Sequence, residues 1–266
     1  MLPCNARTLD SSPEDLRTAR LSDLHDQSYD YSVLRELVKR MSRGVVLQRR
    51  LPKVFGGAPI LVSPDSALSY WKRDLGSVDP YLLSMVRELV RPGMMVWDIG
   101  ANVGLFAFAA AALGAQVLAV EPDIWLSNLL HRSRLLNGLP VTVLPAAVGD
   151  TLTIGKLFLS PQGRASNSMR GSGAYQTTMT VTLDWLVGHF QPPSIVKIDI
   201  EGMEASALRG ASQLLQLKPT ILCEVTREHE LVGSLLRGAG YKMYGARSSE
   251  RHPLQKPYCE TLAIAE

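Results

Sequence analysis

The stretch from Val96 to Phe106 reads VWDIGANVGLF, with glycine, asparagine and glycine at the alternate positions 100, 102 and 104. The apolar run before it (94–99) predicts a buried strand, and the apolar run that begins at Val103 predicts a helix. In open α/β sheets, the turn between such a strand and its helix is where ligands bind. The stretch therefore predicts both a class of fold and the place of a binding site.

Three known kinds of glycine-rich loop do not fit this turn. A dinucleotide-binding loop requires G-x-G-x-x-G, but Asn102 occupies the second glycine position and Gly104 comes one residue early. A phosphate-binding loop ends in Gly-Lys-Ser/Thr, and a nucleophile elbow has a serine between its glycines. Neither feature is present. The pattern from Asp98 to Gly104 is D-x-G-x-N-x-G, which indicates close backbone approach to a ligand that carries no phosphate at this point.

An acidic residue follows the next predicted strand. Glu121 comes after QVLAV (116–120) and lies 121 − 98 = 23 positions beyond Asp98. A carboxylate at the end of the second strand of such a fold accepts hydrogen bonds from ribose hydroxyls. The two features together predict a site for a nucleoside-containing ligand.

Strands and helices alternate along the chain from about residue 71. The alternation predicts a doubly wound, mostly parallel α/β sheet of the Rossmann-like kind, with helices on both faces. Helices are expected at 79–89, 103–113, 123–136, 204–218 and 231–238, and strands at 94–99, 116–122, 141–150, 194–200, 220–225, 241–245 and 261–265. The turn-rich segment 151–172 predicts a hairpin or a mobile loop over one end of the sheet.

Residues 1–70 differ in character and predict a helical N-terminal extension or cap, followed by the main domain at 71–266. A helix start is expected at SSPEDL (11–16), and apolar residues then recur at helical spacing from Leu34 to Met41. Residues 35–53 are locally basic. This pattern is typical of a solvated helix face and a connector; a docking surface for an anionic substrate or a membrane is the alternative.

Composition narrows the classes of function. With 46% hydrophobic and 20% charged residues, the 266-residue chain is expected to be globular, and a net charge of +3 gives no indication of nucleic-acid binding. The apolar stretch 103–120 contains Gly114 and Gln116, which predicts a buried helix, a turn and a strand and not a transmembrane segment. The N-terminus lacks an apolar signal core, and three widely spaced cysteines without a CxxC motif fit a reducing compartment. We expect a cytoplasmic protein, and the sequence leaves open a homo-oligomer.

A second motif, KIDIEGME (197–204), places charges where a central strand is usually apolar. Lys197, Asp199 and Glu201 alternate with apolar residues, so we expect the three to point to one side of the sheet. Buried charges cost several kcal/mol each unless they are paired or face a ligand. The motif predicts a charged group at the mouth of the binding cleft; a Lys197–Asp199 pair that only orders the strand end is the alternative.

The chain resembles class I methyltransferases that use S-adenosylmethionine, and more narrowly the FkbM family. The matching stretches are VWDIGANVGLFAFAAAALGAQVLAVEPD, LPAAVGD, TLDWL and IVKIDIEGMEASALRGASQLLQLKPTILCEV, which cover about residues 95–226. The resemblance implies S-adenosylmethionine as cofactor, held at its methionine and ribose part by Asp98, Gly100, Asn102 and Gly104. It implies that Glu121 binds the ribose hydroxyls and that Asp123, Ala147 and Val148 lie against the adenine.

For transfer to a hydroxyl, a positioned base assists loss of the proton by roughly 10²–10⁴-fold. Asp199 is the first candidate for this base, with Lys197 stabilising the oxyanion, and Glu224 and His229 are the second and third. A divalent cation bound by Asp199, Glu201 and Glu204 is an alternative that we do not predict, and no other metal ligands are expected.

These observations predict an O-methyltransferase that acts on a hydroxyl of a small molecule, a sugar or glycan, or a polyketide-type natural product. Two other functions compete with it. One is a nucleotide-linked oxidoreductase of the NAD type, and the other is an inactive cofactor-binding module that acts through its basic N-terminal part. The loop 151–174 and the N-terminal segment are where we expect the choice of acceptor to be made.

Overall fold

The computed structural model describes residues 36–247 and 252–265. Its centre is a seven-stranded sheet in the order β11-β12-β10-β9-β3-β4-β5, in which β12 runs antiparallel to both its neighbours. The strands in that order are Tyr241–Gly245, Cys259–Ala265, Thr220–Val225, Ile195–Ile198, Met95–Ile99, Gln116–Val120 and Val141–Leu144. The predicted doubly wound and mostly parallel sheet is confirmed, and the antiparallel insertion of β12 was not foreseen.

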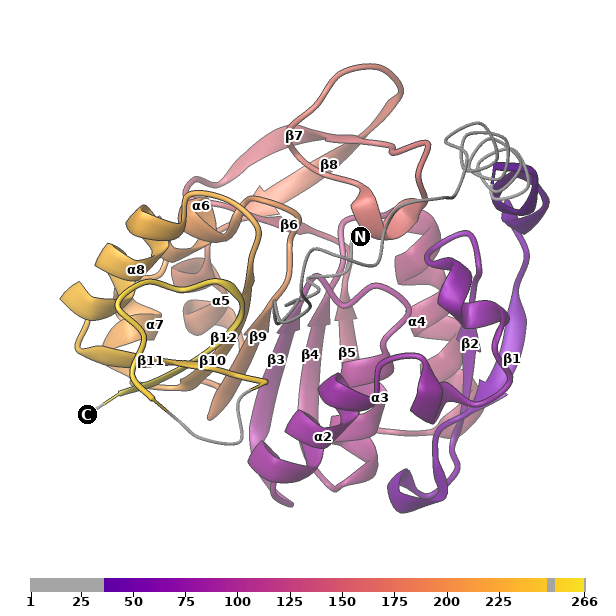
Figure 1. The fold of residues 1–266 in the computed structure, drawn as a ribbon, viewed down its shortest axis with the longest axis horizontal. Coiled ribbons are helices and arrows are strands. Elements are labelled where there is room, and N and C mark those ends of the chain that lie inside the picture. Colours follow the sequence, from indigo (N-terminus) through magenta and orange to yellow (C-terminus); the bar gives the residue numbers. More distant parts are fainter. Residues whose placement is uncertain (1–35, 248–251, 266) are drawn as a thin grey trace, which may run out of the picture.

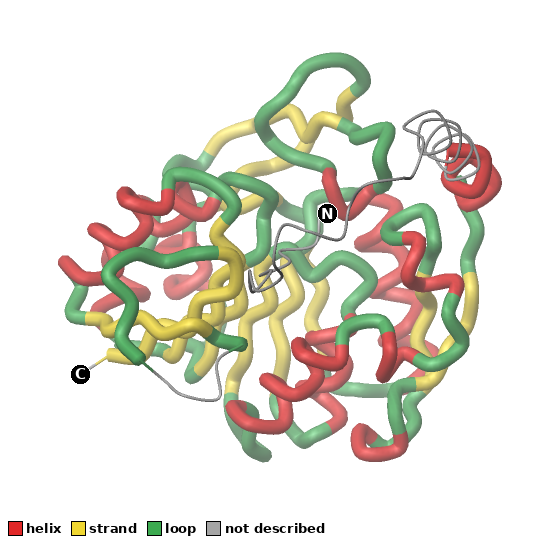
Figure 2. The backbone as a smooth tube through the Cα atoms, in the orientation of Figure 1, coloured by secondary structure: helices red, strands yellow, loops and turns green. Residues whose placement is uncertain are grey.

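Helices cover both faces of the sheet (Figures 1 and 2). One face packs against α2, α3 and α4, and the opposite face packs against α5, α6, α7 and α8. Alternate residues of each central strand enter the two cores, so that Val96 belongs to the first and Trp97 to the second. The helices are α2 (Pro80–Leu89), α3 (Leu105–Ala112), α4 (Ile124–Asn137), α5 (Leu183–His189), α6 (Glu204–Arg209), α7 (Ser212–Gln216) and α8 (His229–Gly238).

The chain reverses its direction of winding at β3. From β3 it passes through β4 to β5 on one side, and it later returns through β9 to β10 on the other. A crevice forms at the carboxyl ends of the strands where the order reverses. Gly100 follows β3, Glu121 follows β4 and Asp199 follows β9, so the two sequence motifs meet at this point.

A second, three-stranded sheet lies across these strand ends (Figure 1). It has the order β6-β8-β7, with β6 at Ala147–Val148, β7 at Thr153–Phe158 and β8 at Tyr175–Val181. Strands β7 and β8 form the hairpin expected for the turn-rich segment, and its connection contains the short 3-10 helix η4 (Arg164–Ser166).

The segment before residue 71 is less helical than expected. Residues 36–42 are helical, but β1 (Leu47–Arg50) and β2 (Pro59–Val62) pair as antiparallel strands. The alternating burial of β2 explains its conformation, because Ile60 and Val62 enter the core beside α4. The expectation of a helical extension is therefore wrong for residues 47–62. The predicted helix start at 11–16 and Leu34 lie outside the described residues.

Three short 3-10 helices follow in this region: η1 (Lys53–Phe55), η2 (Leu68–Trp71) and η3 (Leu75–Ser77). Their apolar side chains Phe55, Tyr70 and Leu75 are buried in the same core as α2 and α3. Residues 47–77 therefore share a hydrophobic core with the sheet.

One further detail corrects the sequence-based expectations. The helix expected at 204–218 is divided at Gly210 into α6 and α7, and the backbone of Gly210 passes close to the carbonyl oxygen of Gly149. Cys223 is free and buried. In the described part of the chain, each helix is too short or too polar to cross a bilayer.

Candidate active site

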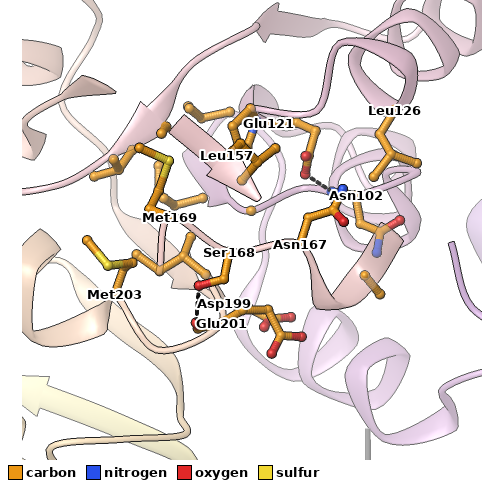
Figure 3. Close-up of a pocket in the computed structure, with 18 of the residues that line it drawn as sticks. Asn102, Glu121, Leu126, Leu157, Asn167, Ser168, Met169, Asp199, Glu201 and Met203 are labelled. Carbon is orange, nitrogen blue, oxygen red and sulfur yellow. Dashed lines mark hydrogen bonds between the residues drawn. The ribbon is translucent and has the colours of Figure 1, made fainter. Parts of the chain in front are cut away.

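A cavity of about 640 Å³, counted to its open mouth, lies at the carboxyl ends of β3, β4 and β9. The wall combines residues from the glycine turn, the end of β4, the β7–β8 connection and the loop after β9 (Figure 3). We call it the main cavity.

Glu121 and Asn102 form one wall of the main cavity (Figure 3). Glu121 Oε2 accepts a hydrogen bond from the backbone N–H of Asn102 at 2.8 Å, and Oε1 accepts one from Asp123 at 2.9 Å. A carboxylate offers about four acceptor positions, so capacity for two ligand hydroxyls remains. Burial raises the pKa of Glu121 to about 7, although these two backbone hydrogen bonds oppose the shift.

The backbone of Asn102 is held in an unusual conformation. Its φ of +54° lies in the left-handed region, and its side-chain oxygen accepts a hydrogen bond from the hydroxyl of the buried Ser66. Left-handed conformation at a residue other than glycine costs about 1–3 kcal/mol and is frequent at functional sites. The turn at 63–66 belongs to the N-terminal segment that we expected to take part in the choice of acceptor, and through this contact it helps to shape the main cavity.

Gly100 lies on the cavity wall, but Gly104 does not. A Cβ atom at Gly100 would lie 1.9 Å from the carbonyl oxygen of Asp199, so glycine here permits the ends of β3 and β9 to approach. At Gly104 a Cβ would meet the side chains of Leu130 and Phe108. The expected role of Gly104 in lining the cofactor site is therefore not supported, and its position is explained by helix packing.

Asp98 and Asp123 were also expected beside the cofactor, yet neither lies on the cavity wall. Asp98 is fully buried, and its Oδ1 lies 3.3 Å from Nζ of Lys197. Asp123 is the N-cap of α4, where Oδ1 accepts hydrogen bonds from the backbone of Trp125 and Leu126. Both carboxylates hold other elements in place.

Sequence reasoning missed two residues that close the main cavity, Arg164 and Asn167 of the β7–β8 connection. Arg164 binds the carboxylates of Asp65 at 3.0 Å and Asp123 at 2.8 Å and lies 4.7 Å from the ring of Trp125. Asn167 donates to Asp123 Oδ2 at 2.8 Å. No sequence signal shows these contacts, because the partners of Arg164 lie 99 and 41 residues away along the chain.

The remaining wall of the main cavity is largely apolar. Ala147 and Val148 lie on it, as the resemblance implied, together with Leu126, Leu157, Met169 and Met203. Such a surface suits a flat heteroaromatic group and an alkyl chain. The polar and the apolar walls together fit a ligand with a ribose, a base and a thioether-type side chain.

Lys197 and Asp199, from the KIDIEGME motif, form a second group of candidate site residues. Nζ of Lys197 lies 3.4 Å from Oδ2 of Asp199 in addition to its contact with Asp98. Burial alone would lower the pKa of Lys197, but the charges of Asp98 and Asp199 outweigh it and raise that pKa above its usual value. Lys197 is therefore a permanent cation between two carboxylates.

Glu201 departs from the expected alternation of charges. Strand β9 ends at Ile198, and Glu201 lies in a turn with a φ of +50°, so that it faces the main cavity instead of accompanying Lys197. Glu204 at the start of α6 is buried, and its Oε1 accepts a hydrogen bond from the backbone of Gly202. Among the described residues, no group of three His, Cys, Asp or Glu side chains is placed to hold a metal ion.

A second cavity, of about 400 Å³ counted to its open mouth, borders the first. It lies between the end of the sheet and the start of α2, and Asp199 lines both cavities. We call it the side cavity. Its other lining residues are Asp79, Tyr81, Leu82, Lys197, Ile198, Leu222, Glu224 and Glu260. Asp199 thus stands at the boundary between two adjoining spaces.

The other two candidate bases are placed very differently. Glu224 lines the side cavity, whereas His229 lies at the start of α8 beside a separate surface depression, with Nδ1 3.0 Å from the carbonyl oxygen of Pro257. The structure therefore does not bring His229 together with Asp199 and Lys197. It is the first residue of α8, four positions beyond the end of β10, and it lines neither the main cavity nor the side cavity.

The ionisation of Glu224 predicts a pH-dependent stability. Burial, and then the charge of Asp199, raise the pKa of Glu224 to about 8 from an ordinary value of 4.5. Between these values the unfolded chain releases a proton that the folded protein keeps, so this group's contribution to stability falls as pH rises from about 4.5 to about 8. Glu224→Gln should therefore gain stability relative to the parent across that interval.

Denaturant unfolding of both proteins between pH 4 and pH 9 measures this difference. Below pH 4.5 the two curves should differ by a constant amount, and the gap should then widen toward pH 8 and level off. Glu230→Gln, at an exposed position of α8, is the matched control and should show no widening. A gap that narrows with rising pH would contradict the raised pKa.

Comparison with known proteins shows similarity to methyltransferases. The family model for the methyltransferase FkbM domain matches residues 98–243. The hexuronic acid methyltransferase AglP of Haloferax volcanii is 30% identical over 164 residues, which cover 58% of this chain. The match spans 65% of that relative, slightly less than two thirds of its length.

Solved structures show a remote likeness. The precorrin-6y C5,15-methyltransferase of Geobacter metallireducens aligns with a TM-score of 0.43 and 12% identity, over 71% of this chain and 89% of that one. The T. thermophilus 16S rRNA N2 G1207 methyltransferase aligns with a TM-score of 0.47 and 15% identity, over 84% and 50%. The assignment of the fold rests on the strand order of this chain.

Proposed function

Because the chain belongs to the FkbM methyltransferase family, we propose that it transfers a methyl group from S-adenosylmethionine to a hydroxyl group of a sugar or a related small molecule. The observation that carries the proposal is the position of Asp199. It lies at the boundary between the main cavity, which has the features of a nucleoside site, and the adjoining side cavity, which contains several carboxyl groups.

The main cavity fits the cofactor at three points. Glu121 keeps acceptor positions for the two ribose hydroxyls beside its backbone hydrogen bonds. Ala147 and Val148 present an apolar surface to the adenine, and the backbone of Gly100 lies on the wall close to Asp199, where the methionine part would lie. S-adenosylmethionine supplies a sulfonium methyl group, which an oxygen nucleophile displaces in line to leave a neutral thioether.

The chain's own contribution to the reaction is positioning and proton transfer. Asp199 is the residue that can take the proton from an acceptor hydroxyl lying in the side cavity and directed at the main cavity. Lys197, fixed between Asp98 and Asp199, places a positive charge beside the oxygen from which the proton leaves. A preorganised charge of this kind stabilises a developing oxyanion without reorganisation.

The proposed acceptor class rests on the relative and on the site. The name of the Haloferax volcanii relative states that it acts on a hexuronic acid, which suggests a sugar acceptor here. The carboxyl groups among the lining residues of the side cavity can accept hydrogen bonds from an acceptor that carries hydroxyl groups. We propose a sugar or glycan as the partner.

Calorimetric titration tests the cofactor half of the proposal. S-adenosylmethionine and S-adenosylhomocysteine should bind, and NAD should bind at least 100-fold more weakly. NAD binding more tightly than both sulfur compounds would overturn the proposal in favour of an oxidoreductase. Transfer of labelled methyl groups to a panel of glycosides tests the acceptor half.

Glu121→Gln should weaken binding of S-adenosylhomocysteine by about 1–3 kcal/mol, because the amide group cannot replace a carboxylate that accepts from ribose hydroxyls and two backbone N–H groups. In the parent protein, affinity should rise with pH through about 7, the pKa of Glu121, since the ionised form is the better acceptor. Both effects are measured by calorimetry between pH 6 and pH 8.

Glu201→Gln is the matched control for this experiment. Glu201 lines the same cavity, and burial likewise raises its pKa to about 7, but it lies at the opposite, β9 side. It should keep both the affinity and its rise with pH. If Glu201→Gln removes the rise and Glu121→Gln keeps it, the ribose role belongs to another residue.

A further inference from the structure

The side cavity owes its charge to a regular feature of the sheet. Asp98 and Lys197 are register partners in β3 and β9, and Glu224 and Glu260 are register partners in β10 and β12. Lys197 pairs with Leu222, and Leu222 and Glu224 lie on one face because strand residues two apart point the same way. This face is the one covered by α2, and its upper edge carries the acidic groups.

The start of α2 supplies the facing wall. Asp79 is the N-cap of this helix, and its Oδ1 accepts a hydrogen bond from the backbone of Leu82 at 2.8 Å. Tyr81 and Leu82 lie beside it on the same wall. The cavity therefore has carboxyl groups on both walls, from Asp79 on the helix and from Asp199, Glu224 and Glu260 on the sheet.

The two cationic side chains described at this cavity are both already bound to carboxylates. Lys197 lies between Asp98 and Asp199, at 3.3 and 3.4 Å. Arg247 binds Glu260, with Nη2 2.7 Å from Oε1, and lies 5.0 Å from the ring of Tyr81. An anionic ligand would therefore have to compete with existing ion pairs for either cation.

A ligand with a carboxylate or phosphate group would have to give up water and lie against the carboxylates of Asp79, Asp199 and Glu260, and juxtaposed like charges are unfavourable. A hydroxyl group has the opposite preference, because carboxylates accept hydrogen bonds and hydroxyls donate them. The aromatic ring of Tyr81 and the side chains of Leu82 and Leu222 add apolar area for the ring of a sugar.

We infer that the side cavity is the acceptor site of the proposed methyl transfer and that it selects an uncharged sugar ring over a uronate or sugar phosphate. The inference rests on the proposed function and deepens it. It also separates this protein from its relative, whose name gives a hexuronic acid as substrate.

In the transfer, the acceptor oxygen forms a bond to the methyl carbon while the carbon–sulfur bond breaks, and its electron pair stays on sulfur. The hydroxyl proton passes to the carboxylate of Asp199. Atoms and charge balance without a further reactant, because the positive charge of the sulfonium disappears as the proton is released.

Matched pairs of glycosides test the inference. Labelled methyl transfer is measured on methyl glucoside and methyl glucuronide, and on the corresponding galacto and manno pairs, with the full chain. At least one neutral sugar should be methylated, at a kcat/KM at least tenfold above that of its uronide. A uronide that is methylated as fast as its neutral partner, or faster, would overturn the inference while leaving methyl transfer to sugars intact.

Two variants test whether the selectivity for a neutral sugar arises in this cavity. Glu260→Gln releases Arg247 and removes a negative charge, and Asp79→Asn removes a charge while asparagine keeps the cap of α2. Each should lower the ratio of neutral to acidic sugar by about tenfold. Glu36→Gln, an equal charge change at an exposed position of the N-terminal helix, should leave the ratio unchanged.

Binding of S-adenosylhomocysteine to every variant, measured by calorimetry, shows that the cofactor site is intact. If it binds and none of the six sugars is methylated, the inference fails and the cofactor half of the proposed function stands. If neither the parent nor any variant binds it, the proposed function itself fails. A ratio that is the same in all three variants and the parent places acceptor selection outside the side cavity.

Discussion

Asp199→Asn is expected to lower kcat by roughly 10²–10⁴-fold, the usual contribution of a positioned base, while the affinity for S-adenosylhomocysteine changes by less than about threefold. Asparagine has nearly the same shape as aspartate but cannot take a proton. The backbone N–H of Asp199 is bonded to the carbonyl oxygen of Ile99, and this bond does not depend on the side chain. The variant therefore tests the chemistry and not the fold.

The surroundings of Asp199 make this substitution informative. Lys197 keeps its contact with Asp98 when Asp199 loses its charge, so the buried cation retains a partner. Loss of both partners would leave an unpaired buried charge, which costs about 3–5 kcal/mol. A small change in the free energy of unfolding together with a large fall in kcat would identify Asp199 as the base.

Glu224→Gln is the comparison that separates the two remaining candidates. Glu224 lines the side cavity but is not part of the main-cavity wall. It should lower kcat far less than Asp199→Asn, at saturating concentrations of both substrates. If instead Glu224→Gln abolishes turnover and Asp199→Asn does not, Glu224 is the base and Asp199 only orders the strand end around Lys197.

The fold could be predicted because its signals are local. Apolar runs of strand length, helix caps and glycine turns recur in order from residue 79 onward, and β3, α3, β4 and α4 lie within two residues of the expected positions. The strands at 47–62 were missed since a short basic segment such as LQRR gives no clear strand pattern. Pairing of this segment with β2, which itself packs on α4, determines its conformation.

The part of the site formed by residues that follow the central strands could be predicted from the sequence. Gly100, Glu121 and Asp199 each follow a parallel strand, so their meeting at one edge of the sheet follows from the topology. Which neighbours line the cavity depends on contacts between distant segments. Asp123 was expected on the wall, but Arg164 and Asn167 engage its carboxylate and line the cavity instead.

Gly100→Ala is expected to reduce the free energy of unfolding by about 2–6 kcal/mol. The positive φ of +80° is strained for alanine, which costs about 1–3 kcal/mol. The added methyl group would lie 1.9 Å from the carbonyl oxygen of Asp199 and 2.9 Å from its carbonyl carbon. Because these neighbours are backbone atoms of the residue directly after β9, the strand ends must separate, and overpacking of this kind costs about 1–3 kcal/mol more.

Gly138→Ala separates the two contributions, because Gly138 has a similar φ of +69° but no atom lies within 4 Å of an added Cβ. Its free energy of unfolding should fall only by the conformational contribution, about 1–3 kcal/mol. Denaturant unfolding of the parent and both variants gives the comparison. Equal losses in the two variants would show that β3 and β9 tolerate separation at Gly100.

The same substitution tests how the two cavities are coupled. Asp199 lines both, and its backbone is the group that an alanine at position 100 would displace. A shift of about 1 Å in a catalytic group costs on the order of 100-fold in rate. The folded fraction of Gly100→Ala should therefore lose methyl transfer as well as stability, whereas Gly138→Ala should keep its kcat. A Gly100→Ala protein with normal kcat would mean that the position of Asp199 is not fixed by the glycine turn.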